Sequence, residues 1–248
     1  MADAMDTTEY TVTGVTGVPQ IRAGDNLGVI LAEALSKTGL GRLVELDVVV
    51  VASKVVSISE GRRVDLASVE EVSAEAQNLS LQIGKDARLV ELILRESTKH
   101  RLATLKGPII ARHKLGFELT SAGVDNAGEG GAYLLPANPD QSAKELATQL
   151  KTFFKVERLG VVVVDSDGRP DRAGATVVAI GSWGFEPLRR THAEVSGRKK
   201  IQEETIVDMI AAAAGIVIGQ RGRGIPFAIV RGVNLETSSA GLQSILHQ

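Results

Sequence analysis

The chain has 248 residues, of which 44% are hydrophobic, so it is long enough to bury a substantial core. With 28 basic and 30 acidic residues the formal net charge is -2, and no basic block exceeds Arg198-Lys199-Lys200, which argues against a nucleic-acid partner. The lack of cysteine excludes disulfides and thiolate metal sites. No run of about 18 apolar residues is present, so we expect a soluble, cytoplasmic protein without a membrane partner.

In the first half of the chain, apolar patterning predicts strands and helices in alternation. The valine run at 48–51 is unbroken, which indicates a strand buried on both faces. Asp25 is the expected N-cap of the first helix. The predicted elements are strands at 10–13 and 46–52, helices at about 25–37, 66–83 and 86–97, and a polar turn at 53–63.

The second half continues the alternation. A helix after Asn138-Pro139-Asp140 is predicted to be capped by Asp140, with Leu146, Leu150 and Phe153 on its apolar face. The predicted elements are helices at 141–154 and 203–218 and strands at 161–164, 175–180 and 227–231.

No Pro- or Ser-rich linker divides the sequence. We therefore expect a mixed α/β (α+β) fold in which 1–248 is a single catalytic unit. Two interleaved lobes are predicted, one roughly from 1–84 with 190–248 and the other from 85–189.

The most informative segment is Asp165-Ser166-Asp167-Gly168-Arg169, which follows the valine run at 161–164. Open α/β sheets usually bind ligands where a buried strand emerges. The carboxylates and hydroxyl can hold a divalent cation, and the guanidinium can hold a phosphate. The alternative is a turn that uses Asp, Ser and Gly for its geometry.

Two glycine-rich segments are further candidates. The first, 121–131, turns around Asp125 and Asn126, and the second, 219–226, combines three glycines with two arginines. Backbone N–H groups in such a loop can surround phosphates, although the second segment lacks the ending of a P-loop. Each could equally be a plain surface connection. Because Asp125, Asp165 and Gln220 lie in three separate loops next to apolar segments, we expect one shared site.

The order of the motifs resembles the coenzyme F420-0:L-glutamate ligase family over nearly the whole chain. No single motif is diagnostic, but their order and spacing are. The matching segments are Gly17-Val18-Pro19-Gln20-Ile21 with Gly24-Asp25, Asp47 to Ser53 with Glu60-Gly61-Arg62, Ala122-Gly123-Val124-Asp125, Leu134-Leu135-Pro136, Asp165-Ser166-Asp167-Gly168-Arg169-Pro170 with Arg172 and Gly174, and Gly224-Ile225-Pro226 with Val230-Arg231-Gly232-Val233-Asn234.

The resemblance implies a GTP-dependent amide ligase, in which a carboxylate is phosphorylated and the amine of L-glutamate then displaces phosphate. It implies Mg²⁺ or Mn²⁺, with K⁺ as a further candidate, and an intertwined homodimer. By position, the metal ligands would be Asp125, Asp165, Ser166 and Gln220. The nucleotide contacts would be Val18, Pro19, Gln20, Ile21, Ser53, Lys54, Asn126, Gly219, Arg221, Gly222, Arg223, Gly224 and Ile225. Arg169 and Arg172 are our own candidates for catalytic stabilisation of the phosphoryl group, on charge and placement.

The sequence also departs from the family pattern. Ile58 stands where a lysine usually precedes the Glu-Gly-Arg turn, and the Asp125 loop is shorter than usual. Two alternatives to an F420-0 ligase therefore stay open. One is a related ligase that joins an amino acid to another small carboxylate, and the other is a relative that binds a nucleotide or cofactor without turnover.

Overall fold

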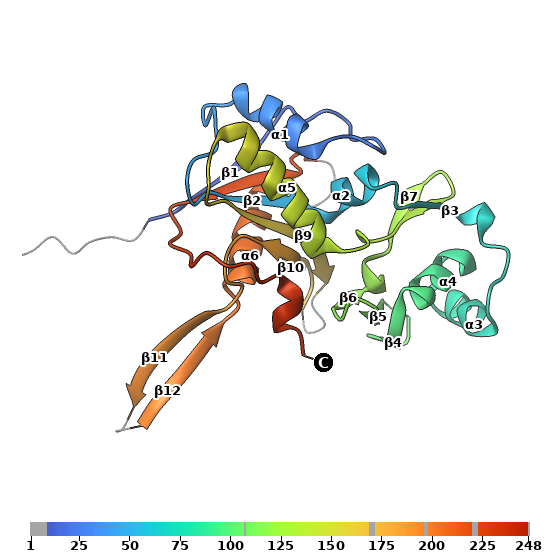
Figure 1. Cartoon of the computed structure of the whole chain (residues 1–248). Helices are drawn as coiled ribbons and strands as arrows, with labels where there is room; N and C mark the ends of the chain where they lie inside the picture. The colour runs from blue at the N-terminus through green and yellow to red at the C-terminus, as the bar shows by residue number, and fades with distance from the viewer. Residues whose placement is uncertain (1–8, 107, 169–171, 196–197, 220–222, 248) are drawn as a thin grey trace, which may run out of the picture.

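The structure is a computed structural model, which describes residues 9–106, 108–168, 172–195, 198–219 and 223–247. A five-stranded sheet forms its centre, with the order β1-β13-β2-β9-β10 (Figure 1). Strands β2 and β9 run parallel, and the other neighbours are antiparallel. The strands are β1 (Thr11–Val15), β2 (Val48–Ala52), β9 (Gly160–Gly168), β10 (Ala175–Trp183) and β13 (Phe227–Arg231).

Helices cover both faces of this sheet (Figure 1). On one face lie α1 (Leu27–Ser36) and α5 (Pro139–Phe154), and on the other lies α6 (Ile206–Ile218). The valines of β2 and β9 are buried, as the unbroken apolar runs predict. The mixed α/β fold class is therefore confirmed.

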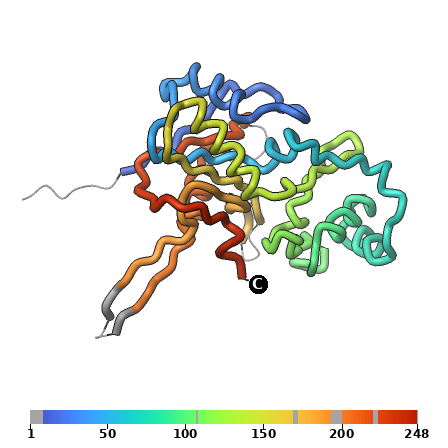
Figure 2. Tube along the Cα trace, viewed as in Figure 1, coloured from blue at the N-terminus to red at the C-terminus, as the bar shows by residue number. Residues whose placement is uncertain are grey.

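A second, smaller lobe is built from the middle of the chain and lies beside the large sheet (Figures 1 and 2). It has two three-stranded sheets, β3-β8-β7 and β4-β5-β6, with two helices packed together. Its elements are β3 (Arg63–Asp65), η1 (Leu66–Ser68), α3 (Ala74–Ile83), α4 (Ala87–Arg95), β4 (Ser97–Leu102), β5 (Ile109–His113), β6 (Glu118–Thr120), η2 (Ser121–Gly123), β7 (Asp125–Gly128) and β8 (Gly131–Tyr133).

The buried apolar residues form two clusters. The smaller cluster consists of residues between 66 and 132, and the larger draws on the chain on both sides of that segment and on Phe117 and Leu119 within it. The division of the chain into two lobes with limits near 84 and 189 stays a prediction. Among the described residues, no helix is long and apolar enough to cross a membrane.

A two-stranded ribbon projects from the large lobe (Figure 1). It pairs β11 (Arg189–Val195) with β12 (Arg198–Glu204) in antiparallel register. Two ion pairs cross it, Arg189 with Glu204 and Arg190 with Glu203, each with an N–O distance of 2.8 Å. These pairs match the cross-strand register and hold the base of the ribbon together.

Two predicted helix caps are wrong. The N-cap of α1 is Asn26, whose side chain accepts from the Val29 N–H, and the N-cap of α5 is Asn138. Asparagine and aspartate are equally good caps, so the pattern does not distinguish a cap from its neighbour. The residues predicted as caps, Asp25 and Asp140, accept other backbone N–H groups.

Other boundaries also differ from the prediction. Residues 53–63 were expected to form a turn, but they contain the helix α2 (Ser53–Ser59). The predicted helix at 66–83 is divided into η1 and α3, because Ser73 caps a new helix by accepting from Ala76 N–H. The predicted helix at 203–218 begins only at Ile206, since the preceding residues pair in β12.

Asp140 holds the last segment of the chain against the large lobe. Its Oδ1 accepts from the backbone N–H groups of Ser182 and Leu242 at 2.7 and 2.9 Å, and its Oδ2 accepts from Gln243 N–H at 3.0 Å. Leu242 begins the short helix η3 (Leu242–Ile245). A Cβ atom at Gly241 would overlap the Asp140 carboxylate, so the close approach requires glycine there.

Replacing Asp140 with alanine is therefore expected to lower the free energy of unfolding by about 3 kcal/mol, because three backbone donors lose their acceptor. Urea denaturation measures this. Asp140→Asn keeps an acceptor oxygen for Ser182 and Leu242 and should lose less. Equal stability of the alanine variant and the unaltered protein would contradict this account.

Candidate active site

The candidate site lies where the parallel pairing of β2 with β9 ends. Ser53 follows β2 directly, and Asp165 comes after the buried valines of β9. The register pairs Ala52 with Val164, so the next residues of both strands reach the same edge of the sheet. There the Ser53 hydroxyl donates to Asp165 Oδ1 at 2.9 Å. This is the edge at which open α/β sheets bind ligands.

The smaller lobe brings Asp125 to the same place. Lys54 Nζ lies 3.2 Å from Asp125 Oδ2 and 5.7 Å from the centre of the Tyr133 ring. The approach to Asp125 is strained, because Ser121 and Ala122 both have left-handed backbone angles, with φ of 54° and 50°. Each such residue costs roughly 1–2 kcal/mol. Both are buried, so packing of the smaller lobe maintains the strained turn.

These residues surround a cavity of about 540 Å³, a size that suits a small-molecule ligand. Polar and apolar side chains from the sheet, α2, α6, the β7–β8 hairpin and two loops line it. The lining comprises Val18, Pro19, Gln20, Ile21, Ala52, Ser53, Lys54, Val55, Ile58, Asp125, Tyr133, Val164, Asp165, Ser166, Val177, Ile218, Gly219, Gly224, Ile225 and Pro226.

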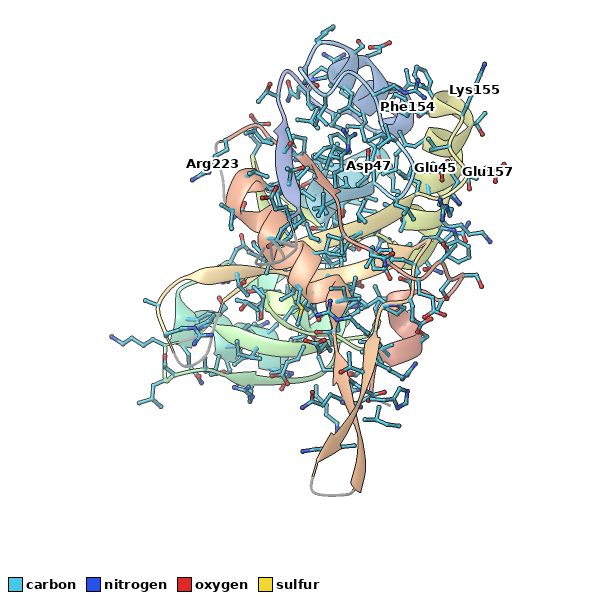
Figure 3. The ribbon with its side chains drawn as sticks, turned by 90° about the vertical axis from the view of Figure 1, so that its left-hand side faces the viewer. Glu45, Asp47, Phe154, Lys155, Glu157 and Arg223 are labelled. Carbon is cyan, nitrogen blue, oxygen red and sulfur yellow. The ribbon has the colours of Figure 1, made fainter. Side chains whose placement is uncertain are left out.

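Most of the site residues expected from the sequence come together in this cavity. Three of the described ones do not line it, namely Asn126, Arg172 and Arg223. The side chain of Asn126 accepts from Gly128 N–H within its own hairpin, and Arg223 donates to the Ile216 carbonyl at the end of α6. Figure 3 shows Arg223 at the edge of the molecule. The expected residues Arg169, Gln220, Arg221 and Gly222 lie outside the described residues.

Sequence reasoning missed some of the apolar lining and its aromatic residue. Tyr133, Val55 and Val177 come from elements whose patterns indicate only core or loop. Ile58 lines the cavity at the position noted for its missing lysine, so an apolar side chain is presented there. In the sequence, the departure of Ile58 from the family pattern was the feature that marked it as a position of interest for the site.

The Glu60-Gly61-Arg62 turn, one of the motifs that match the family, does not line the cavity. Glu60 accepts from Ala137 N–H and from the Ser142 hydroxyl, and Arg62 donates to the Leu135 carbonyl at 3.0 Å. These contacts join α2 to the segment before α5, where the chain returns from the smaller lobe.

Asp165 has a strongly raised pKa. Burial and the nearby negative charge of Asp125 together raise the pKa of Asp165 to about 7, although the hydrogen bond from Ser53 opposes this. A bound cation would relieve this repulsion.

The raised pKa has a consequence for stability in the absence of metal. A folded-state pKa above the unfolded value means that the native protein holds a proton more tightly, so this contribution to stability is lost as pH rises from about 4 through about 7. Asp165→Asn is neutral at every pH and keeps an oxygen for Ser53. We measure the free energy of unfolding by urea denaturation with a chelator present. As pH rises over that range, we expect the value for this variant to increase relative to that of the unaltered protein. A difference that is constant with pH would contradict the raised pKa.

The cavity residues fit a divalent cation such as Mg²⁺ or Mn²⁺. Asp125, Asp165 and Ser166 offer hard oxygen ligands in one cavity, and their repulsion favours a positive ion. Within the described ranges no group of three or more His, Cys, Asp or Glu side chains could hold a metal. Magnesium often uses only one or two carboxylates and completes its shell with water and phosphate oxygens, so two are sufficient.

The fold and the cavity define an α/β protein with a polar ligand site at the ends of its parallel strands. Comparison with known proteins makes this specific. The sequence matches the family described as F420-0:Gamma-glutamyl ligase over residues 16–232. It is 35% identical to the coenzyme F420:L-glutamate ligase of Methanothermobacter thermautotrophicus, over 90% of this chain and 88% of that protein. The ligases of the same name from Methanopyrus kandleri and Methanococcus maripaludis are 38% and 39% identical, over 88% and 81% of this chain and 84% and 80% of theirs.

The chain therefore belongs to the F420-0:gamma-glutamyl ligase family. The resemblance inferred from the motifs is confirmed.

Proposed function

We propose that the protein is a GTP- and divalent-metal-dependent amide ligase that adds L-glutamate to coenzyme F420-0 through an acyl phosphate. Family membership supports the reaction class and the substrates. The observation that carries the proposal is that Asp125 from the smaller lobe and Asp165 from the large lobe line one cavity beside Lys54. Two carboxylates and the ammonium group of Lys54 in one cavity suit the transfer of a phosphoryl group.

Each part of the cavity has a role in this proposal. The apolar surface, which includes Val55 and Ile218, would receive the base of GTP, and Lys54 would bind phosphate oxygens. Asp125, Asp165 and Ser166, with Gln220, would hold Mg²⁺ or Mn²⁺, and K⁺ is a further candidate. When bound, a divalent ion would neutralise charge on the phosphates. Arg169 and Arg172 remain our candidates for stabilising the transferred group.

The proposed reaction has two steps. A carboxylate oxygen of F420-0 attacks the γ-phosphorus of GTP, and GDP leaves. The amine nitrogen of glutamate then attacks the carbonyl carbon, the C–O bond to phosphate breaks, and inorganic phosphate leaves with that oxygen. F420-0 carrying ¹⁸O in its carboxylate should therefore transfer one label to inorganic phosphate. Unlabelled phosphate from a protein that makes the amide would contradict the acyl phosphate.

A second candidate is a ligase for another small carboxylate, which the apolar Ile58 in the cavity favours. It predicts phosphate release with a different acid and none with F420-0. If the protein is a relative that only binds nucleotide, the nucleotide should bind, but no phosphate should be released with any combination of substrates.

We also propose that the protein forms a homodimer. The projecting β11–β12 ribbon, on which Ile201 is 58% exposed, supports this proposal. Analytical sedimentation measures the oligomeric state.

A further inference from the structure

A second cavity, of about 670 Å³, lies beside the first and has no role in the proposal above. It is bounded by β6, β10, the start of α6 and the last residues of the chain. Val177 on β10 lines both cavities, and the strand register places it opposite Ser166. Asp165 in the first cavity and Asp167 in the second are two residues apart on β9, which separates them by about 7 Å along the strand. A ligand of the second cavity therefore lies next to the candidate phosphoryl site.

The carboxylate of Asp167 is held in a fixed orientation. Its Oδ1 accepts from both the backbone N–H and the hydroxyl of Thr120, at 2.8 and 3.0 Å. Both of these hydrogen bonds use Oδ1, and Oδ2 is the oxygen that we assign to the ligand. Two donors from one residue on a neighbouring strand give an acceptor that needs little rearrangement on binding.

Arg112 supplies the opposite charge. One of its guanidinium nitrogens donates to the His247 carbonyl at 2.7 Å, which leaves other N–H donors of the group for a ligand. That bond, with one from the Gln243 side chain to the Leu115 carbonyl at 2.9 Å, ties the end of the chain to the smaller lobe. The end of the chain runs along the large lobe toward the smaller one (Figure 2) and forms one wall of the cavity.

The balance of charge indicates the class of ligand. Three carboxylates line the second cavity, those of Glu118, Asp167 and Asp208, whereas Arg112 is its one described Lys or Arg. Glu118 is paired with Arg101 outside this lining at 3.0 Å, so Asp167 and Asp208 carry the negative charge that faces Arg112. A ligand that carries both an ammonium and a carboxylate group fits this set, and a purely anionic acid does not. An α-amino acid has both groups attached to one carbon.

We propose that the second cavity binds the amine substrate, an α-amino acid, with Asp167 accepting from its ammonium group and Arg112 donating to its carboxylate. The identity of that amino acid as L-glutamate rests on the proposed function. The position beside the first cavity would bring the amine to the activated carbonyl without passing through the nucleotide site.

The test measures L-glutamate binding by calorimetry, with a non-hydrolysable GTP analogue, Mg²⁺ and F420-0 present, and the Michaelis constants of each substrate. Asp167→Asn keeps the acceptor for Thr120 but loses the charge, and Arg112→Met keeps the length of the side chain. Each should weaken glutamate binding by about tenfold or more, with unchanged constants for GTP and F420-0. Lys99→Met is the matched control, since Lys99 is exposed and lies opposite Arg112 in the β4–β5 register, and it should change nothing.

The outcomes separate this proposal from the proposed function. If the dissociation and Michaelis constants for glutamate are unchanged in both variants of an active ligase, the assignment of the second cavity is wrong and the proposed function is unaffected. If only the Michaelis constant for F420-0 rises, the cavity binds the acid substrate, and its assignment to an amino acid is also wrong. If F420-0 is not a substrate, a panel of amino acids is tested for binding. Loss of binding in both variants then supports the cavity, and a protein that binds none of them refutes it.

Discussion

Replacing Asp165 with alanine is expected to abolish turnover while the protein stays folded. Asp165 is the half-buried carboxylate at the point where the parallel pairing of β2 with β9 ends, and it shares its cavity with Asp125 and Ser166. Loss of a residue that only orients a metal ligand commonly reduces activity 10- to 100-fold, so removal of a ligand should reduce ligation by more than about a hundredfold. Phosphate release in the presence of all substrates is the measurement.

The fold should tolerate this change, because the variant removes a carboxylate whose burial is unfavourable when charged. Asp86→Ala is a suitable control, since Asp86 caps α4 in the smaller lobe and does not line the cavity. It should stay active. Full activity of a folded Asp165→Ala protein would remove Asp165 from the metal site.

Replacing Asp47 with alanine is expected to cause the largest loss of stability among the changes considered. Asp47 is completely buried beside β2, and its two oxygens accept from the Arg231 guanidinium at 2.7 and 2.8 Å. It also accepts from Val44 N–H at 2.8 Å. Removing Asp47 leaves the Arg231 guanidinium, which is 34% exposed and so partly reached by water, and the Val44 N–H without their acceptor, and together these losses cost about 3–5 kcal/mol. The melting temperature should fall by about 10 °C.

Glu45 provides the matched control, two residues earlier in the chain (Figure 3). Its carboxylate accepts from the backbone N–H groups of Glu157 and Arg158 at 2.7 and 3.0 Å, and its side chain is 44% exposed. Because water can replace the lost acceptor, Glu45→Ala should lower the free energy of unfolding much less than Asp47→Ala. Equal losses for the two variants would show that the burial of Asp47 contributes nothing.

The central sheet could be predicted because its strands are buried on both faces. The valine runs of β2 and β9 are typical of buried strands and of few other structures. The parallel pairing of these strands places Ser53 and Asp165 at the same edge of the sheet. The strands of the smaller lobe could not be predicted in the same way. Ser97–Leu102 alternates weakly and is mostly polar, so its sequence does not indicate a strand.

The site was predictable to the extent that its chemistry is carried by Asp, Ser and Lys. Asp125 and Asp165 could be selected from their residue types and neighbours, and both line the cavity. The contribution of Tyr133 depends on how the hairpin β7–β8 packs against α2, which is a tertiary contact without a local signal. The second cavity was missed for the same reason, since its walls come from β5, β6, β10 and the end of the chain.

The most direct test of the proposed ligase is to incubate the protein with GTP, Mg²⁺ or Mn²⁺, L-glutamate and F420-0, and to follow phosphate release together with the product masses. The account predicts that phosphate appears only when both substrates are present, with a product heavier than F420-0 by one or more glutamyl residues. Phosphate release without a glutamate-dependent gain in mass, or nucleotide binding without any release, would contradict it.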